Sequence, residues 1–387
     1  MRVPRSLAAA AVLMFTQPGS AFAQEEAAVQ PNGHGFSVIQ RFTGEEASHP
    51  HGGVLPLADG SILGTTWGQN AGTSNIFRIA PDGTRTTTQY FGSDLLGPRL
   101  VLASDGHIYG VSLYQAFRME QDSENLVTLH TFSCCDGGPY RLSAPLVEAT
   151  DGNFYGASGG GGKGVGTIFL MTPAGDVTVL HALRANGLDG IAPNAMIQAA
   201  DGVFYGTTQA GGAHGYGVFF RVRADGTYKV LYDFDLATGT TPSGGLAQSP
   251  NGAIYGTAEG GGTYGHGTVY RVKPDDTLEV VHAFGATSGE GRAPSGLMRS
   301  PEGEFFGTTR AGGADDGNGY GTLYKINGSG NVTTLRKFVN FTGGRHPIDY
   351  VLALGPDGFL YGTCNHGGVR QGPGHSHGKG TVFKIEP

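Results

Sequence analysis

The stretch Asp201-Gly202-Val203-Phe204-Tyr205-Gly206 decides the fold, because a version of it returns six more times along the chain. The shared pattern is an acidic residue or Asn, then Gly, any residue, two apolar or aromatic residues, and a second Gly. Its first glycine stands at positions 60, 106, 152, 202, 252, 303 and 358. The spacings of 46 to 55 residues are typical of a tandem repeat built from one supersecondary unit.

Each repeat predicts four short strands, named A to D. A tight Asp-Gly or Asn-Gly turn joins strand A to strand B, as at 204–207. A Gly-rich loop leads to strand C, as at 267–270, and a second tight turn leads to strand D, as at 278–284. Strand A is expected directly after a Pro, as at 145–147. Units of this length and pattern are typical of the blades of a β-propeller.

The two ends of the repeat region predict how the ring closes. The last repeat stops after its strand C, at Lys384-Ile385, and no strand D follows. The missing strand is found near the N-terminus, as Phe36-Ser37-Val38-Ile39-Gln40-Arg41-Phe42. A strand supplied from the other end leaves no open edge. We therefore predict an all-β fold over residues 35–387, a seven-bladed β-propeller with four-stranded blades, closed by an N-terminal strand that completes the last blade.

Residues 1–23 have the pattern of a secretory signal peptide. Arg2 and Arg5 precede a short apolar run at 7–15, and Ala21-Phe22-Ala23 matches the small-x-small cleavage motif. We expect cleavage near Ala23, a flexible segment at 24–34, and a secreted or periplasmic protein. The apolar run is too short to anchor the chain, so no membrane span is expected.

Composition narrows the class of partner. Lys and Arg number 25 against 32 Asp and Glu, a formal net charge of −7, which argues against a nucleic-acid partner. We expect a monomer. Three Cys do not make a disulfide framework. Cys134 and Cys135 are adjacent and form either a vicinal disulfide or two free thiols, whereas Cys364 occupies a repeat position that small residues fill elsewhere.

The repeat resembles the GloVer (Gloeobacter/Verrucomicrobia) tandem repeat of exported bacterial proteins. The hallmark is Asp-Gly-x-Leu/Phe-Tyr-Gly-Thr-Thr, then Gly-Gly, then Gly-Thr-Val-Phe. The best copies here are 201–208 with Gly211-Gly212, and 255–257 with Gly261-Gly262 and 267–270. The resemblance covers nearly all of the chain after residue 23. It implies an exported, often surface-attached protein, and it implies no established activity.

Any site is expected on one face of the propeller. The A–B and C–D turns are uniformly tight and share one face, whereas the B–C and D–A connections are longer, more variable and share the other, the loop-rich face. Functional residues concentrate on variable loops held by a rigid scaffold. Polar residues of the B–C and D–A connections are therefore the candidate ligand contacts.

Histidines gather on the loops of blades 7 and 1, which are neighbours in a closed ring. His49 and His346 share the repeat position before the strand A Pro, which is filled in the other blades by Gly97, Ala144, Ala192, Thr241 and Ala293. A divalent metal, Zn, Mn or Ca, is the cofactor that such a cluster would hold, and solvated loop histidines are the alternative. Asp315-Asp316-Gly317-Asn318 resembles part of a Ca²⁺ loop but lacks the downstream Glu. The candidate metal ligands are His49, His346, His366, His375 and His377.

Four other loop residues are candidate ligand contacts. Trp67, the sole Trp, offers a stacking surface for a sugar ring or is a plug between blades. Arg345, Arg370 and Lys379 could bind a carboxylate or sulfate, or are simply solvated.

A second group offers the residue types of acid–base catalysis. Tyr216, His266 and Tyr320 fill the middle of the Gly-x-Gly before strand C in blades 4, 5 and 6. A His and Tyr pair is what proton abstraction from a uronic acid needs, although all three also read as ordinary loop residues.

Three functions remain open from the sequence. The first is an exported, non-catalytic module that binds a glycan or a surface protein. The second is a carbohydrate-active enzyme, such as a polysaccharide lyase that uses His and Tyr on the loop-rich face. The third is a structural envelope protein with no small ligand. The first is favoured by the expected export, by the repeat resemblance, and because the sequence contains no phosphate loop, nucleophile elbow or zinc-protease motif.

Overall fold

The structure is a computed structural model. It describes residues 35–43, 48–67, 74–91, 100–123, 125–133, 138–142, 144–314, 319–338, 343–347, 352–368 and 378–387. The predicted signal peptide and the 24–34 segment lie outside the described residues, as do Cys134, Cys135, Arg370, His375, His377 and 315–318. For Trp67 only the backbone is described.

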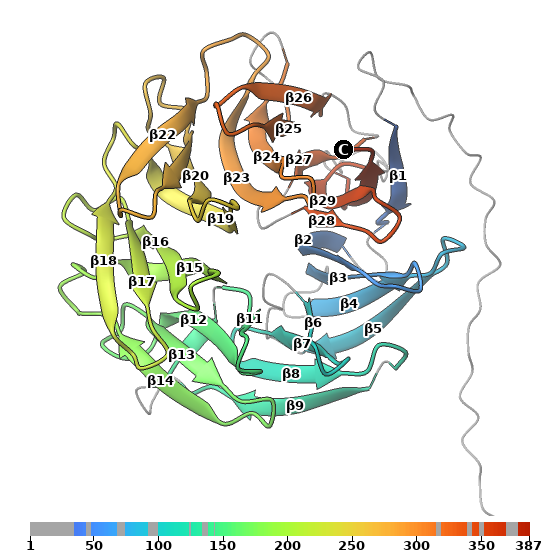
Figure 1. Ribbon diagram of the computed structural model, residues 1–387. Helices are drawn as coiled ribbons and strands as arrows, with labels where there is room; N and C mark the ends of the chain where they lie inside the picture. The colour runs from blue at the N-terminus through green and yellow to red at the C-terminus, as the bar shows by residue number, and fades with distance from the viewer. Residues whose placement is uncertain are drawn as a thin grey trace, which may run out of the picture.

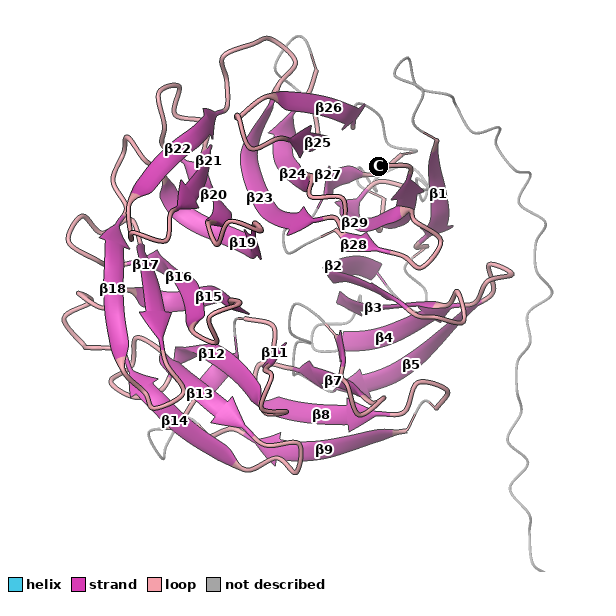
Figure 2. Cartoon of the chain, viewed as in Figure 1, coloured by secondary structure: helices cyan, strands magenta, loops and turns pink. Residues whose placement is uncertain are grey.

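Seven antiparallel sheets stand around a common centre like the blades of a propeller (Figure 1). The described residues form strands, turns and loops and contain no helix (Figure 2). This arrangement confirms the predicted all-β, seven-bladed fold.

The blades follow one another in chain order. Blade 1 has β2 (Ser48–Pro56), β3 (Ile62–Trp67), β4 (Ser74–Ile79) and β5 (Arg85–Phe91), and blade 2 has β6 (Val101–Leu102), β7 (Ile108–Val111), β8 (Gln115–Met119) and β9 (Leu126–Thr131). Blade 3 has β10 (Tyr140–Leu142), β11 (Val147–Glu148), β12 (Phe154–Gly160), β13 (Thr167–Met171) and β14 (Val177–Ala182), and blade 4 has β15 (Ile191–Gln198), β16 (Phe204–Ala210), β17 (Val218–Val222) and β18 (Tyr228–Asp233). Blade 5 has β19 (Thr240–Gln248), β20 (Ile254–Gly260), β21 (Thr268–Val272) and β22 (Leu278–Ala283), and blade 6 has β23 (Gly291–Arg299), β24 (Phe305–Gly312), β25 (Thr322–Ile326) and β26 (Val332–Lys337). Blade 7 has β27 (Arg345–Pro347), β28 (Ala353–Leu354), β29 (Leu360–His366), β30 (Thr381–Ile385) and, from the other end of the chain, β1 (Phe36–Arg41).

The ring closes through β1, as the sequence predicted. β1 pairs antiparallel with β30, with Phe36 opposite Ile385 and Arg41 opposite Thr381. The Phe36 ring packs against Phe338 of blade 6 and Phe383 of blade 7, at centroid distances of 6.1 and 5.6 Å. The N-terminal strand therefore completes blade 7 and also contributes to the core between blades 6 and 7.

The acidic residue of the repeat holds its own turn. The Asp151 carboxylate accepts a hydrogen bond from the Asn153 N–H at 2.9 Å and another from the Tyr155 hydroxyl at 3.0 Å. Asp105, Asp201 and Asp357 make the same two bonds in their blades. The Tyr155 ring in turn stacks on Phe204 of the next blade at 3.9 Å between centroids. The Asp and Tyr of the motif thus connect a turn to the interface between blades.

The second glycine of the repeat is required by a close contact. In all seven blades it pairs across strands B and C with an aromatic residue whose ring lies over it. A Cβ atom on any of these glycines would overlap that aromatic side chain. The pairs are Gly64 with Phe77, Gly110 with Phe117, Gly156 with Phe169, Gly206 with Phe220, Gly256 with Tyr270, Gly307 with Tyr324, and Gly362 with Phe383.

The prediction that strand A starts after a Pro is wrong. β23 begins at Gly291, three residues before Pro294, and in blade 3 the innermost strand is divided into β10 and β11, with Pro145 between them. The register of β10 on β12 places Leu142, not Pro145, at the position of the strand A Pro. The residue equivalent to His49 and His346 in blade 3 is therefore Arg141 rather than Ala144.

Candidate functional site

The loop-rich face is held together by one hydrogen bond that recurs between blades. The middle residue of each Gly-x-Gly accepts a bond from the N–H of the residue before Pro in strand A of the next blade. The bonds are Ala192 to Val165 at 3.0 Å, Thr241 to Tyr216 at 3.1 Å, Ala293 to His266 at 2.9 Å, His346 to Tyr320 at 2.9 Å and His49 to Lys379 at 2.6 Å. All five donor residues have φ of 51° to 53°, in the left-handed region that residues other than glycine rarely adopt.

This bond defines where two groups of predicted site residues lie. Tyr216, His266, Tyr320 and Lys379 occupy one equivalent position in blades 4, 5, 6 and 7, each forming an isolated bridge with a glycine of its own loop. Tyr216 and His266 are exposed, whereas Tyr320 and Lys379 are half-buried. The three proposed catalytic residues thus stand at equivalent positions on three successive blades.

At blades 6, 7 and 1 the structure brings four rings into successive contact, and we call them the aromatic row: Tyr320, His346, His366 and His49. The centroid distances are 5.8 Å from Tyr320 to His346, 5.8 Å from His346 to His366, and 5.3 Å from His366 to His49. All three contacts are edge-to-face, with interplanar angles of 72° to 83°. Three of the five histidines predicted to gather are therefore neighbours.

Cationic groups flank the aromatic row. The guanidinium of Arg345 lies over the Tyr320 ring, 3.4 Å from its centroid. The His346 Nδ1 is 3.0 Å from the carbonyl oxygen of Arg310, a residue that the sequence analysis did not single out. Arg310 also forms an ion pair with Glu259 of blade 5 at 2.9 Å. Burial, and then the charge of Lys379, lower the pKa of His49 below its usual value.

Within the part of the chain that the structure describes, no group of three or more His, Cys, Asp or Glu side chains has the geometry to hold a metal ion. The rings of the aromatic row meet edge to face. His375 and His377, the other proposed ligands, and Arg370 lie outside the described residues. Cys364 is fully buried, and burial raises the pKa of its thiol to about 12, in keeping with the small-residue packing position predicted for it.

Exposed tyrosine side chains form a group that the sequence analysis did not recognise, although it named Tyr216 as a catalytic candidate. Among the described residues, three tyrosine side chains are exposed, and all three lie in B–C connections: Tyr114 (40%), Tyr216 (36%) and Tyr264 (50%). Leu236, 63% exposed, lies in the D–A loop between blades 4 and 5, and its carbonyl accepts a bond from Gly262 of the Tyr264 loop. The alignment of Gly-Gly loops from one repeat to the next could have located Tyr216 and Tyr264, whereas the connection that carries Tyr114 has no Gly-Gly pair.

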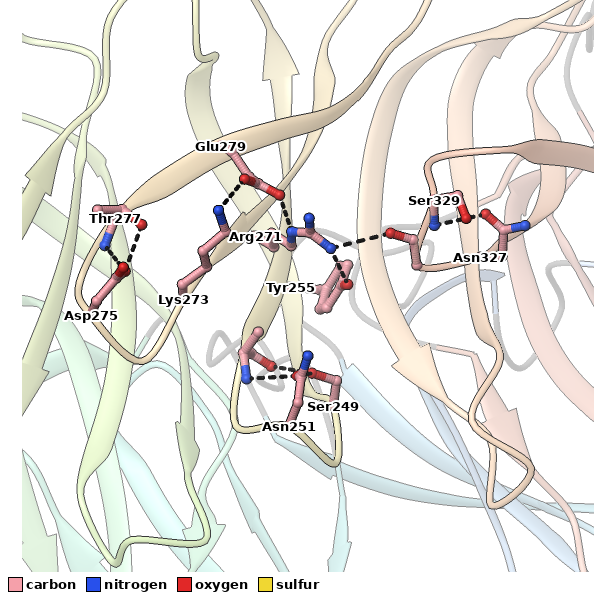
Figure 3. A network of polar contacts seen from close by, with 12 residues as sticks. Ser249, Asn251, Tyr255, Arg271, Lys273, Asp275, Thr277, Glu279, Asn327 and Ser329 are labelled. Carbon is pink, nitrogen blue, oxygen red and sulfur yellow. Dashed lines mark hydrogen bonds and ion pairs between the residues drawn. The ribbon is translucent and has the colours of Figure 1, made fainter.

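The opposite face has a shallow depression of about 410 Å³ at the tight turns of blade 5. Figure 3 shows the polar network beside it. Arg271 bonds Glu279, the Tyr255 hydroxyl at 3.3 Å, and the Gly328 carbonyl of blade 6 at 3.2 Å, while Lys273 pairs with Glu279 at 2.5 Å. The two cations of this network are occupied by partners within the protein, so the network braces blade 5 against blade 6.

The match to a family model identifies the family. The Gloeobacter/Verrucomicrobia repeat model matches residues 19–196 and 192–387, and the chain belongs to this repeat family. Among curated proteins, none matches the chain. No helix in the described part of the chain is long and apolar enough to cross a membrane.

Solved structures of other proteins share the fold. A catalytically inactive histidine-to-alanine variant of virginiamycin B lyase from Staphylococcus aureus, solved with quinupristin, has a TM-score of 0.63 and 13% identity, covering 92% of this chain and 99% of that chain. The extracellular domain of a putative hybrid two-component system from B. thetaiotaomicron has a TM-score of 0.57 and 12% identity, and the match covers 90% of this chain and 39% of that one. At these identities the likeness concerns the fold alone.

Proposed function

We propose that this protein is a secreted or periplasmic propeller that binds a glycan through its loop-rich face and catalyses no reaction on it. The observation that carries the proposal is the placement of the exposed aromatic side chains Tyr114, Tyr216 and Tyr264, all on B–C connections of this face. The flat apolar side of a sugar ring packs on an aromatic ring, while the tyrosine hydroxyl bonds to sugar hydroxyls. The signal-peptide pattern at 1–23 supports export to the periplasm or the cell exterior, where the protein would encounter glycans.

The rigidity of the loops supports a preformed surface. The carbonyl of Tyr216 accepts a bond from Thr241 at 3.1 Å, and the Leu236 carbonyl accepts one from Gly262 at 2.9 Å. Loops tied to their neighbours in this way lose little conformational entropy when a ligand binds.

A glycan array followed by calorimetry tests the proposal. We expect the wild type to bind a subset of glycans, and the triple variant Tyr114→Ala/Tyr216→Ala/Tyr264→Ala to lose at least tenfold in affinity, equivalent to about 1.4 kcal/mol. The matched control removes three exposed apolar side chains on outer strands, by Val127→Ala, Val179→Ala and Val280→Ala, and should bind like the wild type. A protein that binds no glycan, or binds a surface protein instead, contradicts the proposal.

A polysaccharide lyase is the second candidate, and the contact between Tyr320 and His346 favours it. Their rings meet at 5.8 Å beside the guanidinium of Arg345, so a tyrosine, an imidazole and a cation stand together where a uronate could bind. Incubation with uronic acid polymers, followed by the absorbance of unsaturated products, tests this candidate. A lyase would form such products and lose activity in Tyr320→Phe but not in Tyr232→Phe, whereas absence of products in the wild type removes the candidate.

A further inference from the structure

We infer that the glycan is anionic, and that its carboxylate or sulfate groups bind at the aromatic row and its flanking cations Arg345 and Lys379. This inference rests on the proposed function and names the class of its ligand. The row lies at the junction of blades 6, 7 and 1, where three imidazoles and two cations meet on the loop-rich face.

The fold itself does not require these side chains. At the strand A position that His49 and His346 occupy, blades 4, 5 and 6 carry Ala192, Thr241 and Ala293, which have nearly the same φ and make the same backbone bond, and blade 3 carries Arg141. The position of Lys379 is filled by Val165 in blade 3 and by Tyr216, His266 and Tyr320 in blades 4, 5 and 6. The imidazoles of His49 and His346 and the ammonium of Lys379 therefore stand at sites where an alanine methyl or a valine isopropyl group gives the same backbone structure. The backbone does not account for these polar side chains, whereas binding of a ligand would.

The charge around the row favours an anion. Lys379 bonds through its carbonyl to the His49 N–H and lowers the pKa of that imidazole by its positive charge. Arg345 stacks on Tyr320, which orients its planar guanidinium, a group suited to two-point binding of carboxylates and sulfates. Glu259 of blade 5 is paired with Arg310 at 2.9 Å.

The contacts within the row also predict the effect of pH. Burial of His49, and then the repulsion between its protonated ring and Lys379, lower the pKa of this imidazole, which meets the His366 ring edge to face at 5.3 Å. A bound anion reverses this repulsion, so binding and proton uptake favour each other. Affinity for an anionic polymer should therefore rise as the pH falls below about 6.5, the usual pKa of histidine, because the pKa of His49 is lowered from that value.

The test compares three polymers: polygalacturonate, dextran sulfate and uncharged dextran. Binding is measured at pH 8.0 and 5.5 for the wild type and for the triple variant His49→Ala/His346→Ala/Lys379→Val. Each replacement is a residue that another blade carries at the same position, so the variant should fold, and circular dichroism checks that it does. The matched control is Thr241→Ala, which shortens the side chain at the same position in blade 5.

We expect the wild type to bind at least one anionic polymer at least tenfold more tightly than dextran, and more tightly at pH 5.5 than at pH 8.0. The triple variant should lose that preference, and Thr241→Ala should keep it. Preference for polygalacturonate or for dextran sulfate tells a carboxylate ligand from a sulfate ligand. Equal binding of charged and uncharged polymers, or an unchanged preference in the triple variant, overturns the inference while the proposed function stands. If no glycan of any kind binds, the proposed function itself fails.

Discussion

A single atom explains why glycine ends the repeat motif. The second glycine of each repeat lies under an aromatic ring of strand C, and a Cβ atom there has no room. The sequence shows that glycine recurs, but it does not show which ring covers it, because that depends on the register of strands B and C. The same rings lie in the hydrophobic clusters between blades. The absence of a side chain at the glycine therefore allows both the pairing of strands B and C and the packing of one blade on the next.

Gly256→Ala tests this contact. The added methyl would overlap the Tyr270 side chain and lie 2.7 Å from the Leu246 Cδ2 atom, so we expect a loss of about 1–3 kcal/mol in the free energy of unfolding. Gly328→Ala is the control, because its Cβ would have its nearest neighbour, the Tyr255 hydroxyl, at an ordinary 3.7 Å. Denaturant titration measures both variants, and equal stability of the two would contradict the packing argument.

At the scale of the element, buried carboxylates fix the D–A connections. Glu290, between β22 and β23, accepts bonds from His282 Nε2 at 2.7 Å, from the Gly285 N–H at 2.8 Å and from the Ala286 N–H at 3.1 Å. Asp189, between β14 and β15, pairs in the same way with His181 at 3.3 Å. Neither carboxylate was singled out from the sequence, since D–A loops differ in length and the acid has no fixed place in the repeat.

The Glu290 corner predicts how stability depends on acid. Burial alone would raise the pKa of Glu290, but the bonds from His282 and Gly285 outweigh it, and the net pKa is lowered from 4.5. The carboxylate therefore stabilises the fold above about pH 4.5, and this contribution is lost as the pH falls through the lower folded-state pKa. We expect Glu290→Gln to be less stable than the wild type at pH 7 and the difference to shrink towards pH 3. The control is Glu386→Gln, which alters an exposed terminal residue, and a pH-independent difference for Glu290→Gln would contradict the linkage.

Much of the fold and less of the site could be predicted from the sequence. The spacing of the repeats correctly predicts seven blades. The strand D pattern at 36–42, which precedes the first repeat, correctly predicts the closing strand. The rule that strand A follows a Pro gave the wrong start for strand A of blade 3. In that blade Leu142 stands at the position of the Pro, and Pro145 lies between β10 and β11. Spacing also cannot say which way a loop side chain points. The edge-to-face contacts of His49, His346 and His366, and the exposure of Tyr114 and Tyr264, come only from the structure.

For the whole molecule, stability depends on closure by β1. Phe36 and Phe42 are buried at the junction of the two chain ends, and the Phe42 N–H donates to the Gly380 carbonyl at 3.0 Å. We expect deletion of residues 35–42 to expose the edge of β30 and lower the melting midpoint. A synthetic peptide of residues 35–43 should raise the midpoint again in proportion to its concentration. A truncated protein with an unchanged midpoint would contradict the closure mechanism.

Ligands are expected to bind on the loop-rich face, and hydrogen–deuterium exchange tests this most directly because it locates the backbone amides that a bound glycan protects. The protein is compared with and without the glycan found in the array. We predict slower exchange in the B–C loops of blades 4 and 5, at 211–217 and 261–267, with no change in the tight turns at 225–227 and 275–277. Protection confined to the tight turns, beside the depression at Arg271 and Lys273, would contradict the account.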